Sequence, residues 1–175
     1  MKNRIAAGII FVFLSAAVGL GVPVTQIWYQ ADELGAGRWQ YSYKVSNIAL
    51  TGSIEEFTIW FDYGLYDNLV VETPNPPAGN WSEIVLQPEP ALGDDGAYDA
   101  KALYPGIGQG ETVSWFKVSF DWLGQDEPGP QFYEIIDPVT FETIDSGLTV
   151  PEPATLLLLG LGGLALRKRI RHKEQ

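Results

Sequence analysis

The densest group of potential metal ligands in the sequence is an acidic turn that contains Asp94, Asp95 and Asp99. Calcium binds about six to eight oxygen atoms, and carboxylates are among its usual protein ligands. The segment lacks the loop length and the terminal Glu of an EF-hand. Two interpretations stay open: a calcium site at these three residues, or an Asp-Gly turn whose carboxylates are solvated. The simpler expectation is that the chain uses no cofactor.

Three adjacent acidic pairs, Glu55-Glu56, Asp94-Asp95 and Asp126-Glu127, raise the question of glycoside hydrolysis. That chemistry needs two carboxyl groups about 5–10 Å apart across a cleft, whereas neighbouring residues of a strand point to opposite faces. The chain has no Cys and a single His, His172. This composition argues against a cysteine nucleophile, a Ser-His-Asp triad and a multi-histidine metal site. We therefore predict no catalytic residues and a protein that is not an enzyme.

Two tryptophans, Trp60 and Trp115, fall on the polar side of their segments, opposite Phe61 and Phe116. An exposed tryptophan ring can stack against a sugar, and aromatic side chains often line binding sites. Alternatively, a loop covers both rings, or each ring marks the second buried face of a central strand. Carbohydrate contact through Trp60 and Trp115 is therefore one hypothesis, and a structural role is the other.

The elements that must position these residues are predicted to be strands, because apolar and polar residues alternate with a period of two. In Arg38–Ser46, the residues Trp39, Tyr41, Tyr43 and Val45 face one way. Turn residues such as Gly, Pro and Asp separate the segments. We predict one antiparallel β-sandwich of about eight strands over residues 22–150. The expected strands are Val24–Gln30, Arg38–Ser46, Phe57–Tyr63, Leu69–Thr73, Trp81–Leu86, Ala97–Leu103, Phe116–Trp122, Gln131–Ile136 and Val139–Ile144.

Two of these segments resemble each other at an offset of 59 residues, namely Phe57–Tyr63 and Phe116–Trp122. The simpler interpretation is that two core strands obey the same alternation. The alternative is a pseudo-symmetric pair, which would place Asp62 and Asp121 at equivalent strand ends.

The charge is distributed unevenly along the chain. Residues 22–150 carry a net charge of −16, residues 1–21 carry +2, and residues 151–175 carry +3. A strongly acidic body repels nucleic acid and anionic lipid, so we expect no nucleic-acid partner.

The first 21 residues are typical of a secretory signal peptide. A positive start, Met1–Arg4, precedes the apolar run Ile5–Leu14 and the small residues of Ser15–Gly21, which is the order of an exported precursor. The export machinery is therefore an expected partner. The alternatives are a buried strand and a retained anchor.

The other end of the sequence contains three features in order. Pro151-Glu152-Pro153 comes first, and Ala154–Leu166, with no charged residue, follows. The run is shorter than the roughly 20 residues of a usual membrane-spanning helix, so we predict a short transmembrane helix here, in addition to a signal helix at the N-terminus. A basic end comes last and is expected to stay in the cytoplasm under the positive-inside rule. The basic residues are Arg167, Lys168, Arg169 and Arg171.

Together, these three features resemble a PEP-CTERM sorting signal, and the resemblance covers residues 150–173. It implies an exported protein of a Gram-negative bacterium that makes exopolysaccharide. It also implies recognition by an exosortase, a membrane-embedded cysteine transpeptidase, and removal of the tail. A plain membrane anchor is the alternative. The internal copy Pro88-Glu89-Pro90 has no apolar run behind it and is interpreted as a loop.

We therefore divide the chain into a signal peptide (1–21), an acidic β-sandwich (22–150) and a sorting tail (151–175). The leading hypothesis is a non-catalytic protein of the cell surface or extracellular matrix, associated with exopolysaccharide or biofilm and transiently anchored in the inner membrane. The alternative is a carbohydrate-binding module, aided by calcium or not. A glycoside hydrolase is the least favoured.

Overall fold

The computed structural model describes residues 23–74 and 80–152. The predicted signal peptide, the apolar run and the basic end lie outside these residues, as does Pro153. Within the described ranges, none of the structure is a helix long and apolar enough to cross a membrane.

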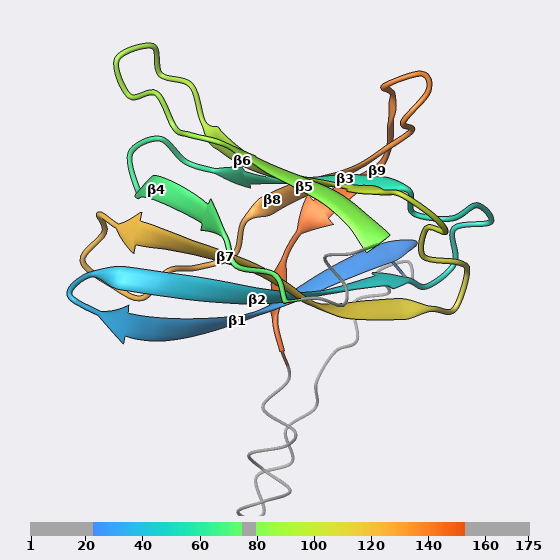
Figure 1. Cartoon of the computed structure of the whole chain (residues 1–175), viewed down its shortest axis with the longest axis horizontal. Helices are drawn as coiled ribbons and strands as arrows, with labels where there is room; N and C mark the ends of the chain where they lie inside the picture. Colours follow the sequence, from blue (N-terminus) through green and yellow to red (C-terminus); the bar gives the residue numbers. More distant parts are fainter. Residues whose placement is uncertain (1–22, 75–79, 153–175) are drawn as a thin grey trace, which may run out of the picture.

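The described residues form two five-stranded sheets packed face to face, which confirms the predicted all-β sandwich (Figure 1). We refer to the sheet with the order β10-β1-β2-β7-β4 as the first sheet and to the sheet with the order β5-β6-β3-β8-β9 as the second sheet. All pairings between neighbouring strands are antiparallel except that of β1 with β10. The strands are β1 (Thr25–Gly35), β2 (Arg38–Asn47), β3 (Glu56–Phe61), β4 (Tyr66–Val71), β5 (Trp81–Leu86), β6 (Gly96–Ala102), β7 (Thr112–Trp122), β8 (Phe132–Ile136), β9 (Thr143–Leu148) and β10 (Val150–Pro151).

The core lies between the sheets and is built mainly from aromatic rings. In β2, the alternation places Tyr41, Tyr43 and Val45 in the interior, where at most 1% of each side chain is exposed. The inner face of β2 is thus buried, as expected for a sandwich.

The two similar segments become strands of opposite sheets that pack against each other. Phe57 of β3 meets Phe116 of β7 at a ring-centre distance of 5.1 Å, and Phe61 meets Phe120 at 6.1 Å. Both pairs keep the offset seen in the sequence. Both segments are therefore core strands with the same alternation. The similarity does not extend to the aspartates, because Asp121 lies within β7 whereas Asp62 follows β3.

Several strand bounds differ from the predicted ones, and in two segments a turn replaces part of the predicted strand. The expected strand Val139–Ile144 is wrong, because the Asp137 carboxylate accepts the backbone N–H groups of Val139 and Thr140 and makes a turn; β9 starts only at Thr143. Similarly, β3 ends at Phe61, so Tyr63 lies in a turn with its side chain exposed, and it is not part of the strand predicted over Phe57–Tyr63.

Candidate functional site

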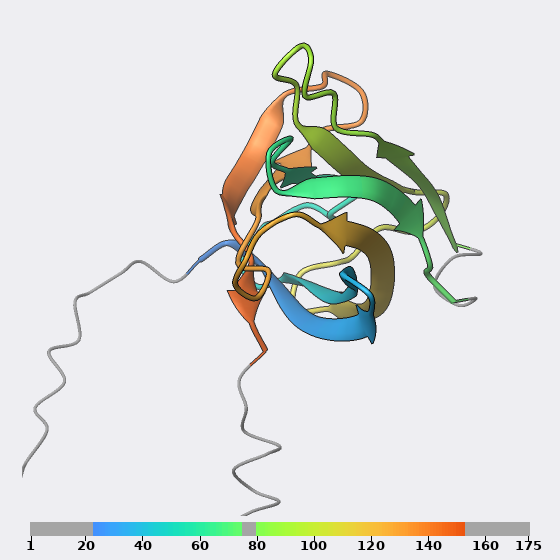
Figure 2. The same cartoon turned by 90° about the vertical axis from the view of Figure 1, so that its left-hand side faces the viewer.

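One end of the sandwich contains a pocket of about 280 Å³, at the end where β3 and β7 finish. Figure 2 views the sandwich from this end. Aromatic rings, two carboxylates and the segment that leads into β8 form its walls. The lining residues are Trp60, Asp62, Leu65, Tyr66, Asp95, Trp122, Gly129, Pro130, Gln131 and Phe132.

Trp60, one of the two tryptophans that the sequence singled out, lies on the outer face of β3 and lines the pocket. Its ring is half-buried, and its Nε1–H group donates to Oε2 of Glu134 in β8 at 2.9 Å. Glu134 also accepts a hydrogen bond from Thr143 at 2.8 Å. The indole is therefore held in one orientation, with part of its surface facing the pocket.

Two carboxylates face the same pocket from different segments. Asp62 Oδ1 accepts the N–H group of Gly64 at 2.7 Å, and Asp95 Oδ1 accepts the N–H group of Tyr63 at 3.0 Å. These bonds hold Asp62 within the β3–β4 turn and Asp95 of the β5–β6 loop against that turn. Within residues 23–74 and 80–152, neither Oδ2 atom has a hydrogen-bond partner. Ligand pockets commonly combine aromatic side chains with a few placed polar groups, as here.

Gln131 is buried at the base of the pocket, where its side-chain amide forms hydrogen bonds with several other side chains. Its Nε2 group donates to the Tyr66 hydroxyl at 2.9 Å, and its Oε1 atom accepts from Tyr43 at 3.3 Å and from Thr149 at 3.2 Å. The Tyr41 hydroxyl donates to the carbonyl of Gly129 at 2.8 Å. Burial raises the pKa of the Tyr41 and Tyr43 phenols far above their usual value, so both stay protonated donors.

From the pocket, a row of apolar side chains continues across the outer face of the second sheet. Leu86 of β5 lies opposite Ala97 of β6, and Ala97 lies opposite Trp60 of β3. Phe132 of β8 lies beside Trp60 at the pocket and opposite Leu148 of β9. With neighbouring strands about 4.8 Å apart, the row is roughly 19 Å long.

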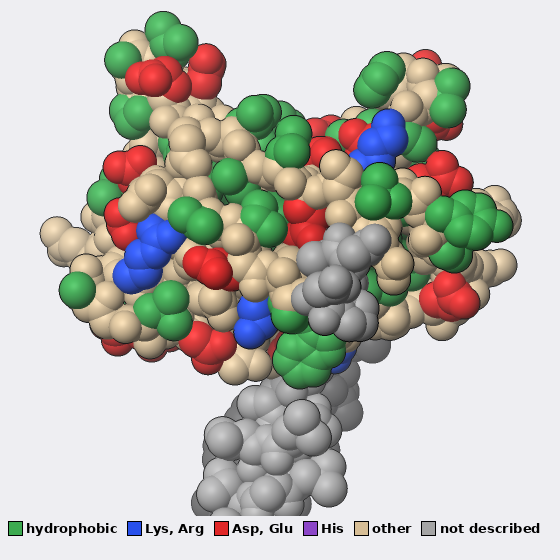
Figure 3. Space-filling model, in the orientation of Figure 1, with side chains coloured by type: hydrophobic (Ala, Val, Ile, Leu, Met, Phe, Trp, Pro, Cys, Tyr) green, Lys and Arg blue, Asp and Glu red, His purple; other side chains and the backbone are tan. Residues whose placement is uncertain are grey.

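Two loops project at either side of this face, and the surface between them is lower (Figure 3). One is the turn between β5 and β6, and the other is the turn between β8 and β9 (Figure 1). Their tips carry exposed apolar side chains, including Leu92 in the first loop and Phe141 in the second, each 74% exposed. We call the apolar row and the face between these loops the saddle.

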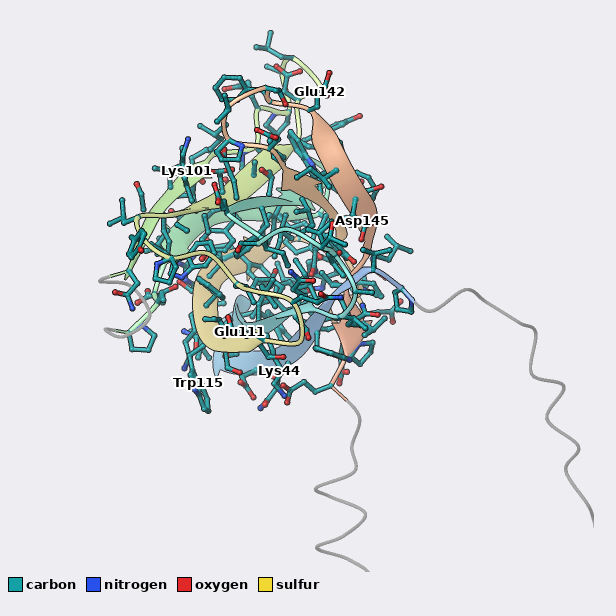
Figure 4. All side chains as sticks on the ribbon, turned by 90° about the vertical axis from the view of Figure 1, so that its right-hand side faces the viewer. Lys44, Lys101, Glu111, Trp115, Glu142 and Asp145 are labelled. Atoms are coloured by element: carbon teal, nitrogen blue, oxygen red, sulfur yellow. The ribbon has the colours of Figure 1, made fainter. Side chains whose placement is uncertain are left out.

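Trp115, the second tryptophan considered as a carbohydrate contact, lies on the first sheet and is therefore not part of the pocket. It is the extra residue of a β-bulge, since Tyr43 pairs with Phe116 while Lys44 pairs with Ser114. Its φ of 81° is unusual for a residue with a side chain. The ring is 62% exposed and points away from the sandwich (Figure 4).

The three acidic residues proposed as calcium ligands have separate partners. Asp94 pairs through its backbone with Glu89, Asp95 faces the pocket, and Asp99 accepts from the Thr58 hydroxyl at 2.8 Å on the outer face of β6. Among the described residues, no three His, Asp or Glu side chains form a group able to hold a metal ion. Partial burial raises the pKa of Asp99. Calcium binding at the three residues stays a prediction.

The first two residues of the predicted sorting motif are part of the folded domain. Pro151 belongs to β10, which pairs in parallel with β1, and the backbone N–H of Glu152 donates to the carbonyl of Tyr29 at 2.9 Å. The Glu152 carboxylate forms an ion pair with Lys44 at 2.9 Å. These contacts could not be predicted from the sequence, because Lys44 is one of several polar residues that alternate with apolar ones in Arg38–Ser46.

Comparison with known proteins identifies this segment as part of a sorting signal. Residues 149–171 match the family model described as the PEP-CTERM protein-sorting motif. The chain is thus a PEP-CTERM sorting domain-containing protein. The motif indicates an exported protein that an exosortase sorts at the membrane, and the exosortase is its processing partner. Among curated proteins, no sequence matches the chain.

Two solved structures are similar to the sandwich. The first is a family 3b carbohydrate-binding module from the biomass sensoring system of Clostridium clariflavum, with a TM-score of 0.41 and 9% identity over 75% of this chain and 89% of that chain. The second is a GH20 exo-β-N-acetylglucosaminidase from Vibrio harveyi in complex with N-acetylglucosamine, with a TM-score of 0.40 and 8% identity over 74% of this chain and 18% of that chain. At these values, neither likeness says what the chain binds.

Proposed function

We propose that the chain is a non-catalytic protein of the cell surface or extracellular matrix that associates with exopolysaccharide. The observation that carries this proposal is the PEP-CTERM motif at residues 149–171. The motif directs the protein to exosortase processing, and the acidic sandwich is the part that acts after export. The association with exopolysaccharide is the function we assign to the sandwich.

As a second candidate, we propose that the sandwich binds carbohydrate directly, through the pocket and the saddle. Trp60 supports this proposal, because its half-buried ring is fixed by Glu134 and lies next to the carboxylates of Asp62 and Asp95. A row of apolar side chains that leads from a pocket, exposed at Leu86, Phe132 and Leu148 and buried at Ala97, suits a chain-like ligand rather than a single small molecule. Trp115 is a separate aromatic contact on the opposite side of the domain.

The charge of the body narrows the class of glycan. Residues 22–150 carry a net charge of −16, so a neutral polysaccharide is favoured over an anionic one, which the field of the domain would repel. An anionic polysaccharide would need bridging cations, and the residues proposed for calcium are Asp94, Asp95 and Asp99. Dependence on calcium therefore separates the two classes.

The test is co-sedimentation of purified residues 22–152 with the exopolysaccharide of the producing bacterium, in calcium and in chelator. We expect the wild-type domain to co-sediment and Trp60→Ala to bind about tenfold more weakly or worse, as for a central aromatic contact. Tyr104→Ala is the matched control, because Tyr104 is 84% exposed and lies outside the pocket. Trp115→Ala tests the other face in the same assay.

Each alternative outcome assigns the binding differently. Loss of co-sedimentation in chelator, reproduced by Asp99→Asn, would favour the calcium-aided module. Equal binding by wild type and Trp60→Ala would exclude the pocket. Failure of the wild-type domain to co-sediment under either condition would refute the association with exopolysaccharide. Release of reducing sugar would contradict the non-catalytic assignment.

A further inference from the structure

The sorting motif begins in an edge strand that is held by the first strand of the domain. Val150 of β10 lies opposite Trp28 of β1, and Pro151 lies opposite Tyr29. Beyond the strand, the N–H group of Glu152 donates to the Tyr29 carbonyl at 2.9 Å. The backbone around the start of the motif is therefore already engaged by the domain itself.

The side chain of the motif's glutamate is also engaged, by a lysine from the strand beyond β1. Lys44 of β2 lies opposite Trp28. Its ammonium group is 5.9 Å from the centre of the Trp28 ring and 2.9 Å from Oε1 of Glu152. Lys44 thus reaches from β2 across β1 to the motif, and the Trp28 ring lies under its side chain. Figure 4 shows Lys44 on the outer side of the first sheet.

These contacts compete with recognition by another protein. Enzymes that act on extended segments take up the peptide backbone by main-chain hydrogen bonds and read side chains in pockets. In the folded domain, the Glu152 carboxylate is bound to Lys44, and the Glu152 N–H group is bound to Tyr29. A transpeptidase that reads the glutamate must displace both partners.

We propose that the folded sandwich masks its own sorting motif, and that the exosortase engages the motif only after Val150–Glu152 separate from β1 and Lys44. This inference rests on the proposed exosortase processing. A strand of two residues at a sheet edge opens locally at low cost, so the motif is available for a fraction of the time. The apparent affinity of the enzyme is reduced by that fraction. The ion pair between Lys44 and Glu152 lowers the fraction of time for which the motif is separated from β1.

The first test measures processing of the full precursor in cells that contain the exosortase, by pulse-chase and intact mass. Lys44→Ala and Lys44→Glu remove the ion pair with Glu152 and leave the motif intact. A partly exposed pair of this kind shifts an equilibrium by up to about fivefold, so we expect processing about two- to fivefold faster. Lys101→Ala is the control, because Lys101 forms a comparable pair with Glu56 on the other sheet.

The second test locks the motif in place. Trp28→Cys together with Val150→Cys introduces two thiols at paired positions of β1 and β10, in a chain that contains no other Cys. We expect the oxidised precursor to be processed at least about fivefold more slowly than its own reduced form, which controls for both substitutions.

The outcomes separate this inference from the proposal on which it rests. An oxidised precursor processed as fast as the reduced one, or Lys44→Glu processed no faster than wild type, would overturn the masking alone. A wild-type precursor whose tail is never removed would overturn exosortase processing and the masking with it.

Discussion

Replacing Gln131 by methionine is expected to destabilise the domain by about 2–6 kcal/mol, although the two side chains are similar in size. The Tyr43 hydroxyl, on a side chain that is 1% exposed, would lose the Gln131 carbonyl as its partner. An orphaned buried donor costs about 1–3 kcal/mol. The bonds to Tyr66 and Thr149 would also be lost. The Tyr66 hydroxyl keeps the Tyr41 hydroxyl as a partner, whereas the Thr149 hydroxyl keeps only the bond that it accepts from the backbone N–H of residue 131. Each of these losses adds about 0.5–1.5 kcal/mol.

The assay is urea unfolding of residues 22–152, followed by tryptophan fluorescence at about pH 7. Gln30→Met is the matched control, because Gln30 is exposed on β1, and it should change stability by less than about 0.5 kcal/mol. Gln131 also lies beneath the pocket, so the variant should weaken carbohydrate binding if the pocket is the site. A loss below about 1 kcal/mol for Gln131→Met, or a loss equal to that of the control, would refute the reasoning.

Two further predictions concern carboxylates with shifted pKa values. Burial raises the pKa of Asp99, so its charged form costs stability at neutral pH. Asp99→Asn should therefore raise the urea midpoint at about pH 7, with no gain below about pH 3, where Asp99 is neutral in both states. Hydrogen bonds from Arg38 lower the pKa of Asp121, which stabilises the fold above the ordinary Asp pKa and less as pH falls. Arg38→Met should thus lower the midpoint at about pH 7 more than at about pH 2; equal losses at both pH values would contradict the assigned ion pair.

The features that could be predicted from the sequence are those that neighbouring residues decide. The alternation of β2 is read along one strand, and it places Tyr41 and Tyr43 correctly in the core. The outward position of Trp60 and Trp115 follows from the same rule. In contrast, β9 contains Ser146-Gly147 instead of an apolar alternation. Gly147 packs against the ring of Tyr133, and an added Cβ would lie 3.1 Å from its hydroxyl oxygen.

The pocket could not be predicted, because its walls come from segments that are far apart in the sequence. Phe132 and Trp122 come near Trp60 only after β8 and β7 have paired into different sheets. The contact between Lys44 and Glu152 has the same origin. A lysine in a polar row has no local signal of a distant partner, so only the three-dimensional arrangement reveals it.

The pairing of β1 with β10 joins the first strand of the described fold to the last. A chain emerges with its N-terminal end first during synthesis, so this edge of β1 stays open until nearly the whole domain exists. Contacts between residues so distant in sequence carry a large loop-closure cost and reward the chain only after the intervening strands are ordered. Attachment of the motif to β1 therefore reports that the body is complete. In a truncated or misfolded protein, the same sorting motif would not be bound to β1. The rate of tail removal would then distinguish fully folded molecules from incompletely folded ones.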